Sequence, residues 1–213
     1  MSLAPAVWAP TVGHEPSRFD AWAATYELSD LQALVFDPVH VVVADLLRRH
    51  ADGRRALLDL GCGTGRLLRR LRTEPGGIAE AVGVDPAPRM LAEARRRRTP
   101  ARLVCASAER LPFPTGAFEV VTVSMSVRHW QDRDAGLAQV ARVLAPGGVL
   151  VVGEPRPAGA SAPRPRRRWG LSSAAAWPGL EVLGGHGLDV VDAKPAPVRG
   201  PVPPVDVVVA RRR

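Results

Sequence analysis

The sequence feature that most constrains the fold is the stretch Leu57–Leu68, LLDLGCGTGRLL. It begins as an apolar run that is too short for a helix and is bounded by glycine, which predicts a buried strand. Glycines then occupy every second position from Gly61 to Gly65, and from Arg66 onward leucines at helical spacing predict a helix. A strand that turns through glycines into a helix exposes backbone N–H groups at a positive helix end, so the stretch predicts a ligand site.

The glycine spacing separates two classes of ligand. A dinucleotide fingerprint needs a third glycine three residues after the second, where the helix packs closely on the strand. Counted from Gly61 and Gly63, that position is Arg66, and the third glycine comes one place earlier, at Gly65. The spacing therefore disfavours a dinucleotide. A glycine loop alone also suits a tight turn without a ligand, so the rest of the chain has to decide.

Composition narrows the class of protein. The 213 residues suit one domain with a full core, and the mean hydropathy near zero is typical of a globular protein. The net charge of +8 is almost all arginine, since Lys194 is the only lysine. With abundant alanine, glycine and proline, this indicates a GC-rich genome as much as an anionic partner.

Other patterns exclude several kinds of site. Cys62 and Cys105 are isolated in different elements, so we expect neither a disulfide framework nor a metal site. No stretch approaches the apolar length of a membrane span, and the start of the chain lacks a secretory signal pattern. We therefore expect a cytoplasmic protein without membrane insertion.

Strand and helix patterns alternate along the chain. We expect strands over residues 57–60, 81–85, 102–105, 119–124, 149–152, 188–193 and 205–210. Helices are expected from Asp37-Pro38, from Arg66, from Pro88 and after Asp132, and Asp37 and Asp132 are the candidate capping carboxylates. The third of these helices ends in four arginines, 95–98, that we expect to be solvated. The fourth would bury Leu137, Val140, Ala141 and Leu144 before Pro146-Gly147-Gly148 stops it.

This alternation predicts a parallel sheet with right-handed crossovers. The connection 195–204 has no room for a crossover helix, so the last two strands should be antiparallel neighbours. We expect a flexible tail over 1–16 and a single domain over 17–213. The domain would comprise a helical cap (17–53), a core (54–154), a Pro- and Arg-rich loop (155–170) and the rest of the sheet (171–213).

Several segments stand in the order found in class I S-adenosylmethionine-dependent methyltransferases, and the chain resembles that family in its type 11, ubiquinone/menaquinone-biosynthesis-like branch. The segments are Asp59–Gly65 (motif I), Val84-Asp85, Ala108–Phe113, Phe118–Val121 and Arg142–Gly148. The resemblance covers about Arg18 to Glu154. It implies an α/β, Rossmann-like, doubly wound and mostly parallel sheet of order 3-2-1-4-5-7-6, with strand 7 antiparallel and an N-terminal helical cap.

The resemblance also implies a cofactor, S-adenosyl-L-methionine, with S-adenosyl-L-homocysteine as product. Asp85, at a strand end, would accept from the ribose hydroxyls. Ser107 stands where relatives often have an aspartate at the adenine, and a hydroxyl accepts more weakly than a carboxylate. The cofactor-binding candidates are Tyr26, Asp59, Gly61, Cys62, Gly63, Gly65, Asp85, Pro86, Met90, Ser107, Ala108, Glu109 and Ser124.

The acceptor side is expected just past the fourth strand. Methyl transfer requires alignment and desolvation rather than a nucleophilic side chain, and a hydroxyl acceptor gains from a base such as histidine. His129 is the candidate base, and Trp22, His40, Arg128 and Trp130 are the candidate substrate contacts. Ser126–Trp130 is also similar to the Gly-Leu-Arg-Asn-Val segment of quinone C-methyltransferases, with Arg128 in register.

These expectations predict methyl transfer to a small-molecule acceptor by a monomer or homodimer. The leading hypothesis is O-methylation of an aromatic or polyketide-like metabolite. Alternatives are C-methylation of a quinone precursor and a cofactor-binding protein without transfer activity. An RNA methyltransferase that uses the arginines of 95–98 and 164–168 is disfavoured, because the chain lacks the Asn/Asp-Pro-Pro motif common in base N-methyltransferases.

Overall fold

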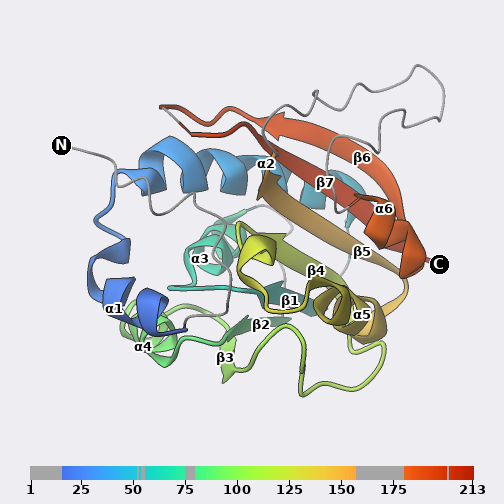
Figure 1. Cartoon of the computed structure of the whole chain (residues 1–213), viewed down its shortest axis with the longest axis horizontal. Helices are drawn as coiled ribbons and strands as arrows, with labels where there is room; N and C mark the ends of the chain where they lie inside the picture. The colour runs from blue at the N-terminus through green and yellow to red at the C-terminus, as the bar shows by residue number, and fades with distance from the viewer. Residues whose placement is uncertain (1–15, 52, 54–55, 75–79, 157–179, 201) are drawn as a thin grey trace.

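The computed structural model of the protein describes residues 16–51, 53, 56–74, 80–156, 180–200 and 202–213 (Figure 1). The expected flexible tail over 1–16 lies outside these residues except for Pro16. The Pro- and Arg-rich loop over 155–170 lies outside them except for Pro155 and Arg156.

The described elements alternate as the sequence predicts. In chain order they are α1 (Pro16–Tyr26), the π-helix η2 (Gln32–Phe36), α2 (Asp37–His50), β1 (Ala56–Leu60), α3 (Arg66–Thr73), β2 (Glu80–Asp85), α4 (Pro88–Arg96), β3 (Arg102–Cys105), β4 (Phe118–Ser124), the 3-10 helix η3 (Val127–His129), α5 (Arg133–Val143), β5 (Leu144–Pro155), α6 (Leu180–Gly185), β6 (Leu188–Ala196) and β7 (Val205–Arg212).

The strands form one sheet in the order β3-β2-β1-β4-β5-β7-β6, which confirms the predicted topology. The pairs from β3 to β5 are parallel, whereas β7 runs antiparallel to both β5 and β6. Strand order reverses between β1 and β4, and in open α/β sheets the crevice outside such a switch point is where ligands bind.

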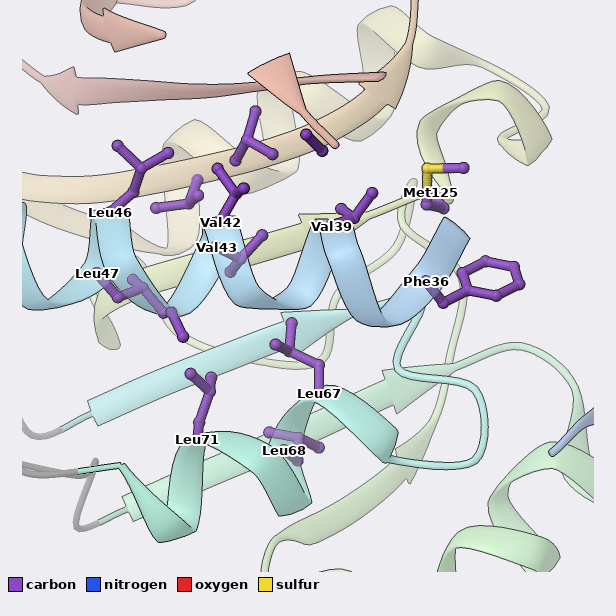
Figure 2. Packing of buried hydrophobic residues seen from close by; sticks show 14 of the residues in the cluster. Phe36, Val39, Val42, Val43, Leu46, Leu47, Leu67, Leu68, Leu71 and Met125 are labelled. Carbon is purple, nitrogen blue, oxygen red and sulfur yellow. The ribbon is translucent and has the colours of Figure 1, made fainter. Parts of the chain in front are cut away.

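Alternate residues of the central strands supply two different cores. Leu57, Val120 and Val149 face α2 and α3, and the residues that follow each of them face α5 and α6. This alternation is the period-2 pattern of a strand that is buried on both faces. Figure 2 shows the α2 side chains gathered with Leu67, Leu68 and Leu71 of α3, in the first of these cores.

The N-terminal helices form the expected cap. Helix α1 packs on α4, where Ala23 clusters with Ala87 and Met90, and Figure 1 shows the two helices together. The Asp20 carboxylate accepts a hydrogen bond of 2.8 Å from the backbone N–H of Arg89, in the first turn of α4. The start of α1 is thereby attached to the start of α4. In the described part of the chain, no helix is both long and apolar enough to cross a lipid bilayer.

Two local expectations are wrong in detail, and one is confirmed. Asp37 does not cap α2, because η2 runs directly into α2 and leaves no helix end to cap; its carboxylate instead binds Arg66. Leu144 begins β5 and pairs with Phe118, so α5 ends before it and the following glycines lie within β5. Asp132 does cap α5, since its side chain accepts from the backbone N–H of Ala135 at 3.0 Å.

Candidate functional site

A cavity that is partly open to solvent lies at the carboxyl ends of β1, β2 and β4, beneath α1. We call the part lined by Gly61, Gly63, Asp85, Met90 and Ala108 the loop half. The part lined by Phe19, Trp22, Arg128, His129 and Trp130 is the aromatic half.

The glycine loop is fixed by its backbone. Gly61 N and Cys62 N both donate to the carbonyl of Val84, at 2.8 and 3.0 Å, so β1 and β2 hold the loop where it leaves the sheet. Gly61 has φ of +77°. A Cβ atom on Gly61 would lie 2.5 Å from Cβ and Oγ of Ser126. Glycine is thus required here both by conformation and by close approach.

Asp85 joins the loop to the end of β2. Its Oδ2 accepts from Gly63 N at 2.8 Å and its Oδ1 accepts from Ala87 N at 2.9 Å. A carboxylate has about four lone-pair sites and can accept several hydrogen bonds at once, and Asp85 lines the cavity. The side chain can therefore brace the loop and still accept from ligand hydroxyls.

Asp59 lies beneath the loop rather than on its surface. It is 3% exposed, and its Oδ1 accepts from the Thr122 hydroxyl at 2.8 Å. Burial raises the pKa of Asp59 to about 7, against the lowering effect of that hydrogen bond, and the negative charge of Asp85 raises it further. A ligand that places positive charge near the loop would favour the ionised form.

These charges distinguish a cationic ligand from an anionic one. Arg66, the first residue of α3, is turned to Asp37 and Glu27, and the acidic groups at the loop are Asp59 and Asp85. Pyrophosphate would be repelled by these carboxylates. A sulfonium with an ammonium group and ribose hydroxyls is complementary to them, so the loop half fits S-adenosylmethionine.

The loop after β3 is tied to the turn after β4. The Glu109 Oε1 accepts from the backbone N–H groups of Gln131 and Asp132, at 2.8 and 3.3 Å. Glu109 and Ala108 line the cavity, whereas the half-buried Ser107 does not. One oxygen of the Glu109 carboxylate thus holds the turn after β4.

The aromatic half is assembled from α1, η2 and η3. The rings of Phe19 and His129 meet edge to face at 4.9 Å between centroids. Tyr26 meets Trp22 at 4.7 Å and Phe36 at 5.5 Å. Burial raises the pKa of the Tyr26 hydroxyl, so the phenol stays neutral. The result is an apolar wall that contains an imidazole.

A partly buried ionic cluster attaches the cap to the glycine loop. Glu27, directly after α1, accepts from Arg66, Arg69 and the Thr64 hydroxyl, at 2.5, 2.5 and 2.6 Å. Arg66 also binds the Asp37 carboxylate with two nitrogens, at 2.8 and 2.7 Å. We call Glu27, Asp37, Arg66 and Arg69 the Glu27 cluster; it holds Tyr26 beside the cavity.

Most of the predicted site residues come together in this cavity. Its lining includes Trp22, Tyr26, Gly61, Gly63, Asp85, Pro86, Met90, Ala108, Glu109, Ser124, Arg128, His129 and Trp130. Asp59, Cys62, Gly65 and Ser107 lie outside the lining, and the first three are parts of the strand and loop that shape it. The buried hydroxyl of Ser124 makes no hydrogen bond within the described residues.

His40 requires a correction. This histidine was expected among the substrate contacts, but it is buried on α2 and does not line the cavity. Burial lowers the pKa of His40 to about 4, against the opposite effect of the nearby Asp37. A neutral histidine packed near Asp37 and Arg66 belongs to the interior of the cap.

Six lining residues were missing from the sequence-based candidates: Arg18, Phe19, Phe36, Leu60, Met125 and Ser126. The aromatic residues at helical spacing in the cap are a signal that could have found Phe19 and Phe36. Ser126 directly follows the β4 pattern. Met125 has a left-handed backbone with φ of +59°. Glycine or asparagine at this position would have indicated such a conformation in the sequence, but methionine does not.

Comparisons with known proteins show similarity to methyltransferases. Residues 58–152 match the family model described as a methyltransferase domain. Over 112 residues the chain is 47% identical to the demethylmenaquinone methyltransferase of Thermus thermophilus, and this aligned region covers 50% of each chain. It is 38% identical over 100 residues to the ubiquinone/menaquinone biosynthesis C-methyltransferase of Burkholderia vietnamiensis, with 45% of this chain and 41% of that protein covered.

A solved structure extends the similarity to the whole fold. The 1,6-didemethyltoxoflavin-N1-methyltransferase of Burkholderia thailandensis, solved with its substrate and S-adenosylhomocysteine, has a TM-score of 0.68 at 19% identity. The similarity covers 92% of this chain and 86% of that one. The chain spans about half the length of the curated relatives it matches.

Proposed function

We propose that this chain is a class I S-adenosylmethionine-dependent methyltransferase and that it transfers a methyl group to a ring carbon of a hydroxylated aromatic acceptor, such as a quinone precursor. The observation that carries the proposal is one continuous cavity with an acidic glycine loop on one side and aromatic rings with an imidazole on the other. Support for carbon as the acceptor atom comes from relatives named as quinone methyltransferases.

The loop half holds the donor. S-adenosylmethionine supplies a methyl group on a positively charged sulfur, which becomes neutral when the methyl leaves. Gly61 and Gly63 let the backbone approach the ligand closely, and Asp85 is the ribose acceptor. Asp59 adds negative charge beneath the loop. The protein's own contribution is to fix the donor and to exclude water.

The aromatic half holds and activates the acceptor. Phe19, Trp22 and Trp130 supply flat apolar surface for an aromatic ring. His129 takes the proton of the acceptor hydroxyl as general base, which makes the neighbouring ring carbon nucleophilic. The guanidinium of Arg128 stabilises the negative charge left on the acceptor oxygen. After transfer, the ring carbon loses its proton to solvent, which restores the aromatic ring, and the protonated His129 returns its proton to the acceptor oxygen, so that one proton is released for each methyl group transferred.

Methylation of the acceptor oxygen is the second candidate, because the same deprotonation by His129 makes that oxygen nucleophilic. The two outcomes are separated by incubating the protein with ¹³C-methyl-labelled S-adenosylmethionine and a panel of naphthoquinols and phenols. We expect an aryl-methyl signal in the NMR spectrum of the product. A methoxy signal would replace the proposal by O-methylation, and no turnover by a chain that binds the cofactor would indicate a binding protein.

Substitution of the base gives the mechanistic test. We expect His129→Ala to lower kcat by about 10²- to 10⁴-fold, the usual contribution of a positioned base. The affinity for S-adenosylhomocysteine should be unchanged in calorimetric titration, because His129 lies in the aromatic half. His50→Ala, at the far end of α2, is the control. Wild-type kcat in His129→Ala would remove this residue from the mechanism.

A further inference from the structure

The residues proposed to act on the acceptor lie on a short turn with little regular structure. This turn, Met125–Trp130, is called the His129 turn. Met125 enters it with a left-handed backbone, and two short-range backbone hydrogen bonds close the turn, from His129 N to Ser126 O (2.9 Å) and from Trp130 N to Val127 O (3.2 Å). A turn of this length cannot fix two functional side chains by itself.

A buried carboxylate on the neighbouring strand supports this turn from below. Glu154, at the end of β5, is 3% exposed. Its Oε1 accepts from the backbone N–H of Val127 at 2.7 Å, and its Oε2 accepts from Arg128 Nη1 at 3.2 Å. One side chain thus fixes both the backbone of the His129 turn and the direction of the Arg128 guanidinium.

The buried position of Glu154 makes its negative charge unfavourable, so stabilisation of the fold does not by itself explain why a carboxylate lies there. Burial raises the pKa of the Glu154 carboxyl, against the lowering effects of Arg128 and of the Val127 N–H. A buried ion pair is often no more stable than apolar residues of similar size, so its presence is weak support for a purely structural role. A carboxylate is, however, the group that can accept from a backbone N–H and a guanidinium together.

We propose that Glu154 is a positioning residue that sets the His129 turn, and through it Arg128 and His129, for the reaction. It does not line the cavity and touches no reacting atom. The assignment rests on the proposed methyl transfer, because that reaction gives Arg128 and His129 their roles. Its structural part, the dependence of the turn on Glu154, stands independently of the reaction.

The sheet offers a matched control. Asp206 of β7 is the register partner of Glu154, is also buried, and binds Arg156 with two hydrogen bonds of 2.7 and 2.8 Å. It has the same kind of ion pair on the next strand, and its hydrogen bonds within the described residues go to Arg156 rather than to the His129 turn. Asp206→Asn therefore measures how much activity and stability change when a buried carboxylate beside Glu154 is lost but the His129 turn keeps its own hydrogen bonds.

The test compares Glu154→Gln with Asp206→Asn. The glutamine oxygen can still accept from Val127 N, but its NH₂ group faces the Arg128 donors, so Arg128 loses its direction. We expect kcat to fall roughly ten- to a hundredfold in Glu154→Gln, as for a small misplacement of catalytic groups. The affinity for S-adenosylhomocysteine should stay within roughly twofold, and Asp206→Asn should keep wild-type kcat. Glu154→Asp, which keeps the charge but shortens the side chain, should be intermediate.

Amide hydrogen exchange at Val127 supplies a readout that needs no turnover. Protection of this amide should fall in Glu154→Gln and persist in Asp206→Asn. If the wild type methylates no acceptor, the proposed function fails, and the exchange comparison alone decides whether Glu154 sets the turn. Equal kcat in the two variants, equal protection of Val127, or a parallel loss of cofactor affinity and kcat would overturn the proposal. If Glu154→Gln does not fold, Glu154→Asp is judged by the same measurements.

Discussion

The loop half of the cavity is held by hydrogen bonds to its own backbone, whereas the aromatic half is held by side chains from three separate segments. Gly61, Cys62 and Gly63 all donate backbone N–H groups to β2 or to Asp85 at its end. Phe19 and His129 meet only because α1 folds over the turn after β4. The first arrangement joins two successive strands, β1 and β2, and the loop between β1 and α3, whereas the second joins α1 to a turn more than one hundred residues later in the chain.

This difference implies a division of labour. Damage to the loop half should weaken cofactor binding, and damage to the aromatic half should slow turnover while the cofactor still binds. The Glu27 cluster joins the two, because it bonds both to Thr64 in the loop and to the end of α1. The following variants are chosen to test whether the two halves are separable.

The largest effect is expected at Gly61. Gly61→Ala forces alanine into a left-handed conformation, which costs about 1–2 kcal/mol, and also drives its Cβ against Ser126. We expect a loss of S-adenosylhomocysteine affinity of about 3 kcal/mol, or more than a hundredfold. Calorimetric titration measures this loss.

Gly147→Ala is the matched control for this substitution. Gly147 has φ of +70°, close to that of Gly61, but no heavy atom of the described residues lies within 4 Å of the added Cβ. It should lose some stability and keep its affinity. Equal losses of affinity in the two variants would mean that the close approach at Gly61 is not what shapes the loop half.

The next effect is expected at the Glu27 cluster. Glu27→Gln removes a carboxylate whose side chain is 5% exposed and which binds two arginines. We expect the free energy of unfolding to fall by about 2–3 kcal/mol, below the range for fully buried pairs because Arg66 and Arg69 remain partly exposed. Denaturant unfolding measures the loss, and both cofactor affinity and turnover should decline together.

The pKa of Glu27 determines how the stabilisation by the Glu27 cluster changes with pH. Burial acts to raise the pKa of Glu27, but the hydrogen bonds from Thr64 and Arg69 outweigh it, so the pKa is lowered. A lowered pKa means that the stability contributed by Glu27 is present above its unfolded pKa and is lost as the pH falls through its folded pKa.

Asp45→Asn is the control for Glu27→Gln. This variant loses exposed ion pairs with Arg48, Arg49 and Lys194 and should lower the free energy of unfolding by about 1 kcal/mol or less. Equal costs for the two variants would refute the role of the cluster.

The same contrast explains which features the sequence could predict. The strands, the glycine loop and the Asp132 cap follow from local patterns of burial, glycine spacing and capping, whereas the order of the strands in the sheet follows from the family resemblance; the structure confirms them. Asp37 was expected to cap α2 but binds Arg66 of α3 instead. No local pattern contains that pairing, because it depends on how the cap packs on the core.

Residues of the aromatic half were harder to predict for a related reason. His40 and Phe19 both come from the cap, and only the packing of the helices decides that Phe19 reaches the cavity while His40 is buried beside Asp37. Met125 adopts a conformation that its residue type disfavours. A site formed by the backbone, such as the glycine loop, can be predicted from the spacing of its residues in the sequence. A site formed by side chains from distant segments, such as the aromatic half, can be identified only once the fold is known.

The smallest effect is expected at Asp59. It tests whether the loop half binds the cofactor through its backbone alone or also through the charge of this residue. Burial raises the pKa of Asp59 to about 7, so in the free protein this carboxyl is half protonated near neutrality. Its contribution to stability is present below the unfolded pKa and is lost as the pH rises through the folded value. A bound ammonium group would favour the ionised form, so binding should release a proton. We expect the affinity for S-adenosylhomocysteine to rise about tenfold between pH 6 and 8.

Asp59→Asn isolates this charge. The variant should bind with an affinity that changes little over the same pH range, and it should be at least as stable as the wild type above pH 7, since it has no buried charge to form. Calorimetry in buffers of different ionisation enthalpy would count the released protons. An affinity that is flat with pH in the wild type would show that Asp59 does not sense the cofactor. The loop half would then be a purely backbone site, with Asp59 only a buried partner of Thr122.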